Sequence, residues 1–103
     1  MPGAMRALDH ELFDEQFAQL TPREMRYALA LHDLGPGPHR SDEIVAALDR
    51  PSSELSSIRA QLLKKDVIVA PSRGVLEFRL PLTSSYIERH RRALQKTAAL
   101  ARP

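Results

Sequence analysis

Basic side chains gather in the second half of this sequence, where they could bind an anion. Residues 55–103 hold ten Lys and Arg against three Asp and Glu, a balance of +7, and residues 1–54 hold five against ten, a balance of −5. Together they give the net charge of +2. The asymmetry favours one face that meets an anion, although charges clustered by chance on solvated helices would give the same count.

Three groups of residues are candidates for contacting phosphates. Arg40 and Ser41 stand at the start of a short predicted helix, whose N-terminus could hold a phosphate, although Ser41 could equally be only a helix cap. Arg73 lies in a predicted turn and suits a minor groove or a phosphate, unless it is simply solvated. A basic rail at positions i, i+3 and i+7 of the last predicted helix consists of Arg89, Arg92 and Lys96.

Other kinds of site lack the residues they need. The chain has no cysteine, and its four histidines (His10, His32, His39 and His90) have no metal-ligand spacing. No Ser-His-acid order, Gly-rich phosphate loop or paired carboxylate site is present. The serines between residues 52 and 57 are typical of helix caps and exposed positions. We therefore expect no enzymatic activity, no cofactor and no metal.

The composition is that of one small globular domain. The chain has 103 residues, of which 43% are hydrophobic and 27% charged. No apolar run approaches the ~18 residues of a membrane span, and the N-terminus lacks the apolar core of a signal peptide. The absence of cysteine fits a cytoplasmic protein. We expect a cytoplasmic location and no membrane partner.

The first predicted helix covers residues 9–20. Leu12, Phe13, Phe17 and Leu20 recur at helical spacing, opposite a side that is acidic. This periodicity predicts an amphipathic helix whose apolar stripe packs on the rest of the domain.

The second predicted helix has the clearest start signal in the chain. Thr21 is the N-cap, Pro22 is the first helical residue, and Glu24 completes a capping box. The helix should run to about Leu34, before a Gly-Pro-Gly-Pro break. Apolar residues on two sides predict that it is central in the fold or touches a partner. They are Met25, Ala28 and Leu29 on one side, and Tyr27, Leu31 and Leu34 on the other.

Two shorter helices and two strands follow. Ser41 is expected to cap a helix over residues 42–48, and Ser52 or Ser53 to cap the next helix, whose body spans about Glu54 to Lys65. Its buried stripe is expected to be Leu55, Ile58 and Leu62, supported by Leu63. Strand-like runs at residues 67–70 and 75–80 flank a turn at residues 71–74.

A last helix is predicted from a cap at Thr83 or Ser84 to about Leu100. Its apolar stripe is expected to be Tyr86, Ile87, His90, Leu94 and Ala98. The fold class is then α+β, mainly α: a winged helix-turn-helix with a two-stranded wing and flanking N- and C-terminal helices. The expected organisation is an N-terminal extension at residues 1–20, the winged core at 21–81 and a basic amphipathic helix at 82–103.

In a helix-turn-helix, the second helix lies in the major groove. Here its outward arc is expected to be Ser53, Ser57, Ala60, Gln61 and Lys64. Because that arc has no Arg or Asn, backbone and shape contacts should outweigh base readout. Arg59 lies about 40° from Leu55 on the helical wheel, beside the core stripe. We expect it to form a structural ion pair with an acid such as Asp42 or Glu43.

Four runs carry a resemblance to a known family. They are residues 20–24 (Leu-Thr-Pro-Arg-Glu), 34–44 (Leu-Gly-Pro-Gly-Pro-His-Arg-Ser-Asp-Glu-Ile), 57–68 (Ser-Ile-Arg-Ala-Gln-Leu-Leu-Lys-Lys-Asp-Val-Ile) and 78–81 (Phe-Arg-Leu-Pro). Over about residues 20–92 the chain resembles the C-terminal winged-helix module of prokaryotic AAA-type P-loop ATPases, which are distantly similar to archaeal origin-recognition and initiator ATPases. The Gly-Pro-Gly-Pro-His-Arg-Ser run is fairly specific, whereas Leu-Leu-Lys-Lys-x-Val-Ile is shared by many winged helices.

Two departures from that family matter. The chain has no Gly-x-x-x-x-Gly-Lys-Ser/Thr loop, so it cannot hydrolyse ATP as those proteins do. Asp66 stands where such modules usually have Gly at the helix end, and Asp tolerates a left-handed cap better than most residues. The resemblance implies either an excised module or a stand-alone DNA-binding protein, with an ATPase domain as a partner in cis or in trans.

Two functions follow from these patterns. The leading one is a non-enzymatic domain that binds double-stranded DNA with modest sequence specificity, as part of an ATPase or as a small transcription regulator. The alternative is a protein-interaction or dimerisation module without specific DNA binding, because winged helices also serve in docking. The apolar stripes of the terminal helices could then form a homodimer.

Overall fold

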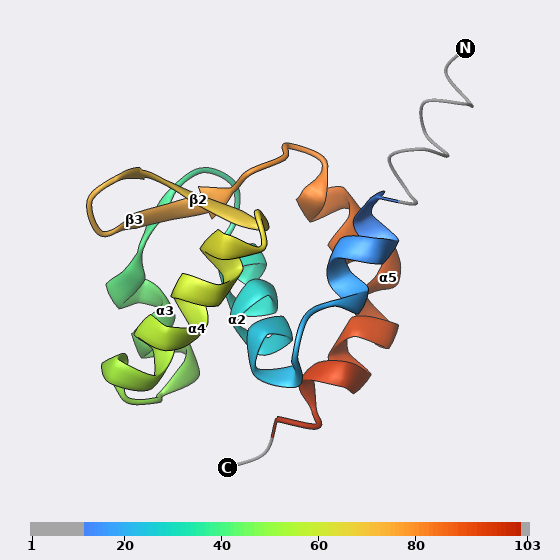
Figure 1. Cartoon of the computed structure of the whole chain (residues 1–103), viewed down its shortest axis with the longest axis horizontal. Helices are drawn as coiled ribbons and strands as arrows, with labels where there is room; N and C mark the ends of the chain where they lie inside the picture. The colour runs from blue at the N-terminus through green and yellow to red at the C-terminus, as the bar shows by residue number, and fades with distance from the viewer. Residues whose placement is uncertain (1–11, 102–103) are drawn as a thin grey trace.

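Helices make up most of the chain in the computed structural model, which describes residues 12–101 (Figure 1). The order is α1 (residues 12–18), α2 (Pro22–Asp33), β1 (His39–Arg40), α3 (Ser41–Leu48), α4 (Ser52–Lys64), β2 (Ile68–Ser72), β3 (Val75–Phe78) and α5 (Thr83–Ala98). The fold class is therefore α+β and mainly helical, with one three-stranded antiparallel sheet. Residues 9–11 of the first predicted helix lie outside the described residues.

Helix α2 is the centre of the molecule, and its predicted start is confirmed. The Thr21 hydroxyl accepts a hydrogen bond from the Glu24 amide at 3.2 Å, and the Glu24 carboxylate accepts one from the Thr21 amide at 3.0 Å. Both apolar sides of the helix are covered, because α4 packs on it from one side and α5 from the other (Figure 1). The central position predicted from its two apolar sides is thus confirmed.

The predicted caps of three other helices are wrong by one residue or more. Ser41, Ser52 and Thr83 are the first helical residues, and in none of these helices does the side chain of the N-cap residue accept a capping bond. At α3 the reason is tertiary. The Ser41 amide donates to the carbonyl of Gly74 at 2.9 Å, so this residue is held by the β2–β3 turn instead of serving as a cap.

The sheet contains a strand that the sequence pattern did not predict. Its order is β1-β3-β2, so the predicted two-stranded hairpin gains a third strand on the far side of β3. β1 has only two residues, with His39 opposite Leu76 and Arg40 opposite Val75. The turn is also shorter than predicted, because β2 continues to Ser72. β3 ends at Phe78, so Leu80 lies beyond the strand and is exposed.

Helices α1 and α5 meet on the side of α2 that faces away from α4, and they complete one hydrophobic core. The ring of Tyr86 lies 5.2 Å from that of Phe13 and 5.1 Å from that of Phe17, and its hydroxyl donates to Asp14 at 2.5 Å. Burial is the largest of the causes that raise the pKa of the Tyr86 phenol, and the hydrogen bond to Asp14 raises it further. The predicted stripe of α5 is confirmed, although the helix is kinked at His90. The prediction that Leu12 packs on the rest of the domain is wrong, because 59% of this residue is exposed.

The end of α4 is tied to the junction between α1 and α2. The Lys65 ammonium lies 2.6 Å from the Glu24 carboxylate and 2.8 Å from the Gln19 carbonyl. The Gln16 amide donates to the Asp66 carbonyl at 3.2 Å. Asp66 itself has a φ of +62°, which confirms the left-handed helix end predicted for it. These contacts orient α4, and through it the hairpin, against the rest of the fold.

Candidate nucleic-acid interface

The predicted outward arc of α4 is exposed as a whole. Leu55 and Leu62 are buried on its inner side, with Ile58 half-buried beside them. The side chains that face outward are Ser53, Ser57, Ala60, Gln61 and Lys64. Small residues occupy three of these five positions, so another molecule can approach the helix backbone closely. Gln61 and Lys64 are the long polar side chains on this surface.

The short strand β1 brings two separate candidates together at one end of the sheet. Because Arg40 is opposite Val75 and the Ser41 amide bonds to Gly74, the N-terminus of α3 adjoins the turn that carries Arg73. Arg40 is extended into solvent, with 76% of its side chain exposed and Asp42 3.7 Å away. Arg73 is exposed at the tip of the hairpin. Sequence reasoning named these residues separately, but a two-residue strand has too little periodicity to predict their pairing.

Arg59 does not form the ion pair predicted for it. It is half-buried, and no acid lies within ion-pair distance of it among the described residues. Asp42 instead faces Arg40, and Glu43 faces His39 and the Arg40 amide. Burial raises the pKa of Tyr27 to about 12, and the nearby charge of Arg59 opposes that rise. Arg59 thus lies beside the central helix, as its angle on the wheel indicated, but without the expected partner.

Ion pairs divide the basic residues of the described chain into two classes. Lys65, Arg79 and Arg91 each contact an acid, as do Arg23, Arg40 and Arg50. Within residues 12–101, no ion pair involves Arg59, Lys64, Arg73, Arg89, Arg92 or Lys96. The positive charge left for an external anion is therefore concentrated on α4, on the hairpin tip and on α5.

The basic rail on α5 is not part of the α4 surface. Arg89, Arg92 and Lys96 are all exposed, as predicted. Helix α5 packs on α2, which lies between α5 and α4 (Figure 1). The rail and the α4 arc therefore belong to helices on opposite sides of α2, whereas Arg40 and Ser41 adjoin the turn that carries Arg73.

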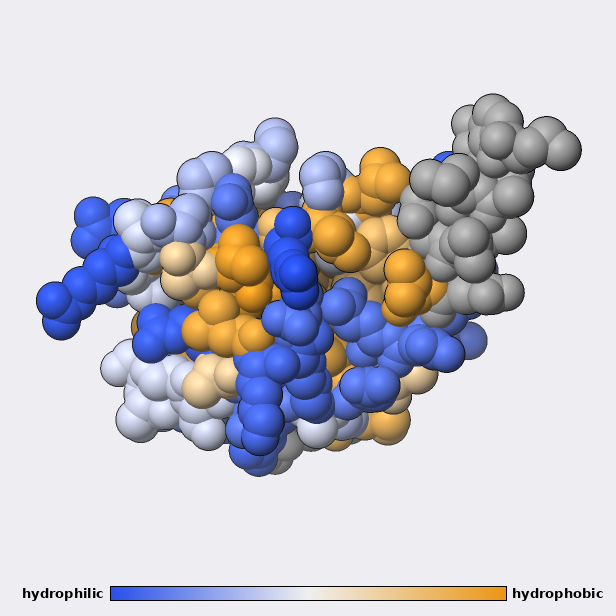
Figure 2. All heavy atoms as spheres, turned by 45° about the horizontal axis from the view of Figure 1, so that its top comes forward, coloured by the Kyte–Doolittle hydropathy of each residue, from blue (hydrophilic) through white to orange (hydrophobic). Residues whose placement is uncertain are grey.

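An apolar patch lies at the β3–α5 connection and the start of α1. Figure 2 shows hydrophobic residues that interrupt the hydrophilic surface there. Leu80 and Leu82 are 39% and 53% exposed, and Leu12 lines the same groove as Leu80. The sequence pattern did not predict this patch, because it placed Leu12 in the packed stripe of the first helix and residue 80 inside a strand.

Comparison with known proteins identifies the family but not an activity. A family model described as "Domain of unknown function (DUF8462)" matches residues 10–87, more than half of the chain, so the chain belongs to this family. Neither the curated proteins nor the solved structures contain a match. In the part of the chain that the structure describes, no cluster of three potential metal ligands occurs. None of its helices combines the length and the apolar character needed to cross a membrane.

Proposed function

We propose that this member of the DUF8462 family is a winged helix-turn-helix protein that binds double-stranded DNA and catalyses no reaction. Helix α4 is the recognition helix, α3 is the first helix of the motif, and the β2–β3 hairpin is the wing. The observation that carries the proposal is that Lys64 on the α4 arc and Arg73 at the hairpin tip are exposed and form no ion pair within residues 12–101, while the exposed Arg40 has only a 3.7 Å contact with Asp42. Cationic side chains that are left unpaired beside an exposed helix suit a duplex, whose phosphates surround the groove that the helix enters.

The composition of α4 supports modest sequence specificity. Gln61 can pair with adenine, and Lys64 can pair with guanine or a phosphate. The serine hydroxyls can form hydrogen bonds with several base edges. The remaining contacts, at Arg40, Ser41 and Arg73, are suited to phosphates or to a minor groove. Most of the binding free energy should therefore be electrostatic and independent of sequence.

A salt series tests the proposal directly. Anisotropy of a labelled mixed-sequence duplex of ~20 base pairs should show binding at low salt that weakens as salt rises, with a slope of about −0.9 per phosphate contacted. Reversing Lys64 and Arg73 together to glutamate should weaken binding at least about tenfold and reduce the slope by about two. Absence of binding at low salt, or an affinity that does not change with salt concentration, would refute the proposal.

The rail on α5 supplies a matched control. Reversal of Arg89 and Arg92 to glutamate changes the net charge by the same amount as reversal of Lys64 and Arg73. Because these residues lie beyond α2 from the α4 arc, the loss of affinity for a short duplex should be clearly smaller. Equal losses from both pairs would mean that net charge, and not the α4 surface, governs the binding.

The resemblance to the C-terminal modules of AAA-type ATPases supports two settings for this activity. In one, the chain is the DNA-binding module of an ATPase and works with an ATPase domain in cis or in trans. In the other, it is a small cytoplasmic transcription regulator. A gene that continues upstream into a P-loop ATPase would decide for the first setting.

A second candidate function is protein interaction or dimerisation without specific DNA binding. The exposed apolar patch at Leu12, Leu80 and Leu82 favours it, because exposed apolar clusters often mark interfaces. Sedimentation at several protein concentrations would test the dimeric form. A strict monomer at every concentration would remove it.

A further inference from the structure

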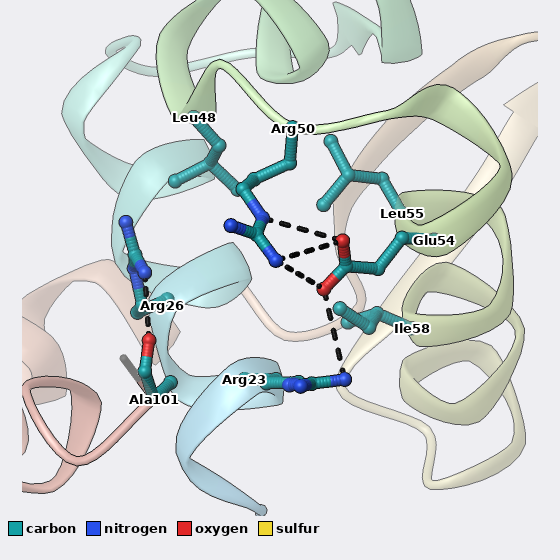
Figure 3. Close-up of a pocket in the computed structure, with 8 residues that line it drawn as sticks. All are labelled: Arg23, Arg26, Leu48, Arg50, Glu54, Leu55, Ile58 and Ala101. Atoms are coloured by element: carbon teal, nitrogen blue, oxygen red, sulfur yellow. Dashed lines mark hydrogen bonds and ion pairs between the residues drawn. The ribbon is translucent and has the colours of Figure 1, made fainter. Parts of the chain in front are cut away.

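A small pocket lies where the start of α2, the α3–α4 turn and α4 meet residue 101 (Figure 3). Three arginines surround it: Arg23 and Arg26 from α2, and Arg50 from the turn. Its apolar lining consists of Leu48, Leu55 and Ile58. The three arginines come from the acidic half of the chain, and sequence analysis assigned them no role.

The pocket contains more positive than negative charge. Arg50 binds the Glu54 carboxylate through two of its nitrogens, at 3.2 and 3.1 Å, and Arg23 approaches the same carboxylate at 3.6 Å. Arg26 donates to the carbonyl of Ala101 at 2.8 Å, which is a neutral acceptor. Three guanidinium groups therefore share one carboxylate among the residues that line the pocket.

Glu54 shows how a carboxylate binds here. The hydrogen bond from Arg50 is the largest of the effects that lower the pKa of Glu54, and the charges of Arg23 and Arg26 act in the same direction. A guanidinium carries five N–H donors in a fixed fork, which pairs well with a carboxylate. Arg23 uses one nitrogen in a long contact, with 60% of its side chain exposed. Donors therefore remain for a second carboxylate.

We propose that this pocket binds an acidic side chain of a partner protein. The cavity has about 20 Å³ of space, which is room for no more than the carboxylate tip of a glutamate or aspartate, and the arginines suit that carboxylate. A DNA backbone fits less well, because its phosphates stand along a rigid duplex that cannot enter a small recess between helices. Leu55 and Ile58 belong to the inner side of α4, so the pocket is separate from the surface proposed for DNA.

Two substitutions in this pocket should change the affinity for an acidic peptide in opposite directions. The probe is a labelled hexapeptide of alternating glutamate and leucine, measured by anisotropy against the full chain. Arg23→Gln should weaken binding of the peptide about tenfold, since one charge-assisted contact is lost. Glu54→Gln should strengthen it by a similar factor, because the donors of Arg50 become available. A purely structural Arg50–Glu54 pair predicts no such strengthening.

Controls separate this site from general attraction between charges and from misfolding. Lys96→Gln removes one exposed charge from the other side of α2 and should leave peptide binding unchanged. The same hexapeptide with glutamine in place of glutamate should not bind. Urea unfolding of each variant establishes that it is folded, and Arg23→Gln is the variant with the least structural cost because Arg23 is mostly exposed.

Three results would overturn the inference. The first is Glu54→Gln binding the peptide no more tightly than the wild type, and the second is an equal loss of binding from Lys96→Gln and Arg23→Gln. The third is a loss of duplex binding in Arg23→Gln with no change in peptide binding, which would assign the pocket to DNA. None of these results depends on whether α4 binds DNA, so the two proposals can fail separately.

Discussion

Two adjacent lysines at the end of α4 have opposite surroundings. Lys64 is exposed, and within residues 12–101 it takes part in no ion pair. Lys65 is bonded to the Glu24 carboxylate at 2.6 Å and to the Gln19 carbonyl at 2.8 Å. Replacing each with methionine keeps the aliphatic stem and removes only the charge. Lys65→Met should therefore destabilise the fold, whereas Lys64→Met should weaken DNA binding.

The size of the effect at Lys65 follows from the burial of its partner. Only 6% of the Glu24 side chain is exposed, against 24% for Lys65. Removing one partner of a fully buried ion pair costs about 3–5 kcal/mol, because the other charge is left without compensation. Partial exposure of Lys65 and the remaining bond from the Thr21 amide reduce this, so we expect about 2–3 kcal/mol.

Urea unfolding followed by circular dichroism measures this difference. Lys65→Met should lower the midpoint with an unchanged slope, and its melting temperature should fall by about 10 °C or more. Lys64→Met should stay within about 0.5 kcal/mol of the wild type. In the duplex assay, Lys64→Met should reduce the salt slope by about one. Equal stabilities of the two variants would refute the structural role of Lys65, and an unchanged salt slope in Lys64→Met would refute the binding role of Lys64.

Three further predictions concern the fold. Phe17→Ala removes a buried ring from Tyr86 and should cost about 3–5 kcal/mol in urea unfolding; a cost below 1 kcal/mol would mean that α1 is not part of the core. Asp66→Ala should cost about 1 kcal/mol because of its positive φ, whereas Asp66→Gly should be at least as stable as the wild type, and the reverse order would exclude a left-handed helix end. Because the pKa of Glu54 is lowered from 4.5, this carboxylate adds stability above that pH and loses it as the pH falls through the lowered pKa. Urea unfolding between about pH 3 and 6 should therefore show that Glu54→Gln loses less unfolding free energy than the wild type as the pH falls. If the two proteins lose the same amount, the ion pair is contradicted.

The features that the sequence predicted correctly depend on neighbours along the chain. The capping box at Thr21 and Glu24 needs only residues three positions apart, and it is present with both bonds. The buried stripe of α4 follows from helical spacing alone. The left-handed end at Asp66 was expected from the family resemblance, because Gly usually stands at this helix end in such modules, and its φ is positive. In each case the determining contact lies within about one turn of a helix.

The features that the sequence missed depend on residues far apart in the chain. Strand β1 exists because β3 offers it an edge to pair with, and its two residues show no strand pattern of their own. That pairing decides that Ser41 starts a helix instead of capping one. Leu12 matches the helical apolar spacing and yet is exposed, since nothing in the described fold covers it fully.

The basic residues show the division between sequence and tertiary structure most clearly. The sequence by itself determined the charge asymmetry, the order of the helices and of the two hairpin strands, and the exposure of the α4 arc. It could not distinguish Lys64 from Lys65, which are identical in type and adjacent in position. Only the packing of α2 against α4 decided which of them is neutralised, and the same packing brought Arg23 to the Glu54 carboxylate, which Arg50 binds from four residues away. The physical reason is that burial and charge pairing depend on distances in space, which spacing along the chain does not encode for contacts between separate elements.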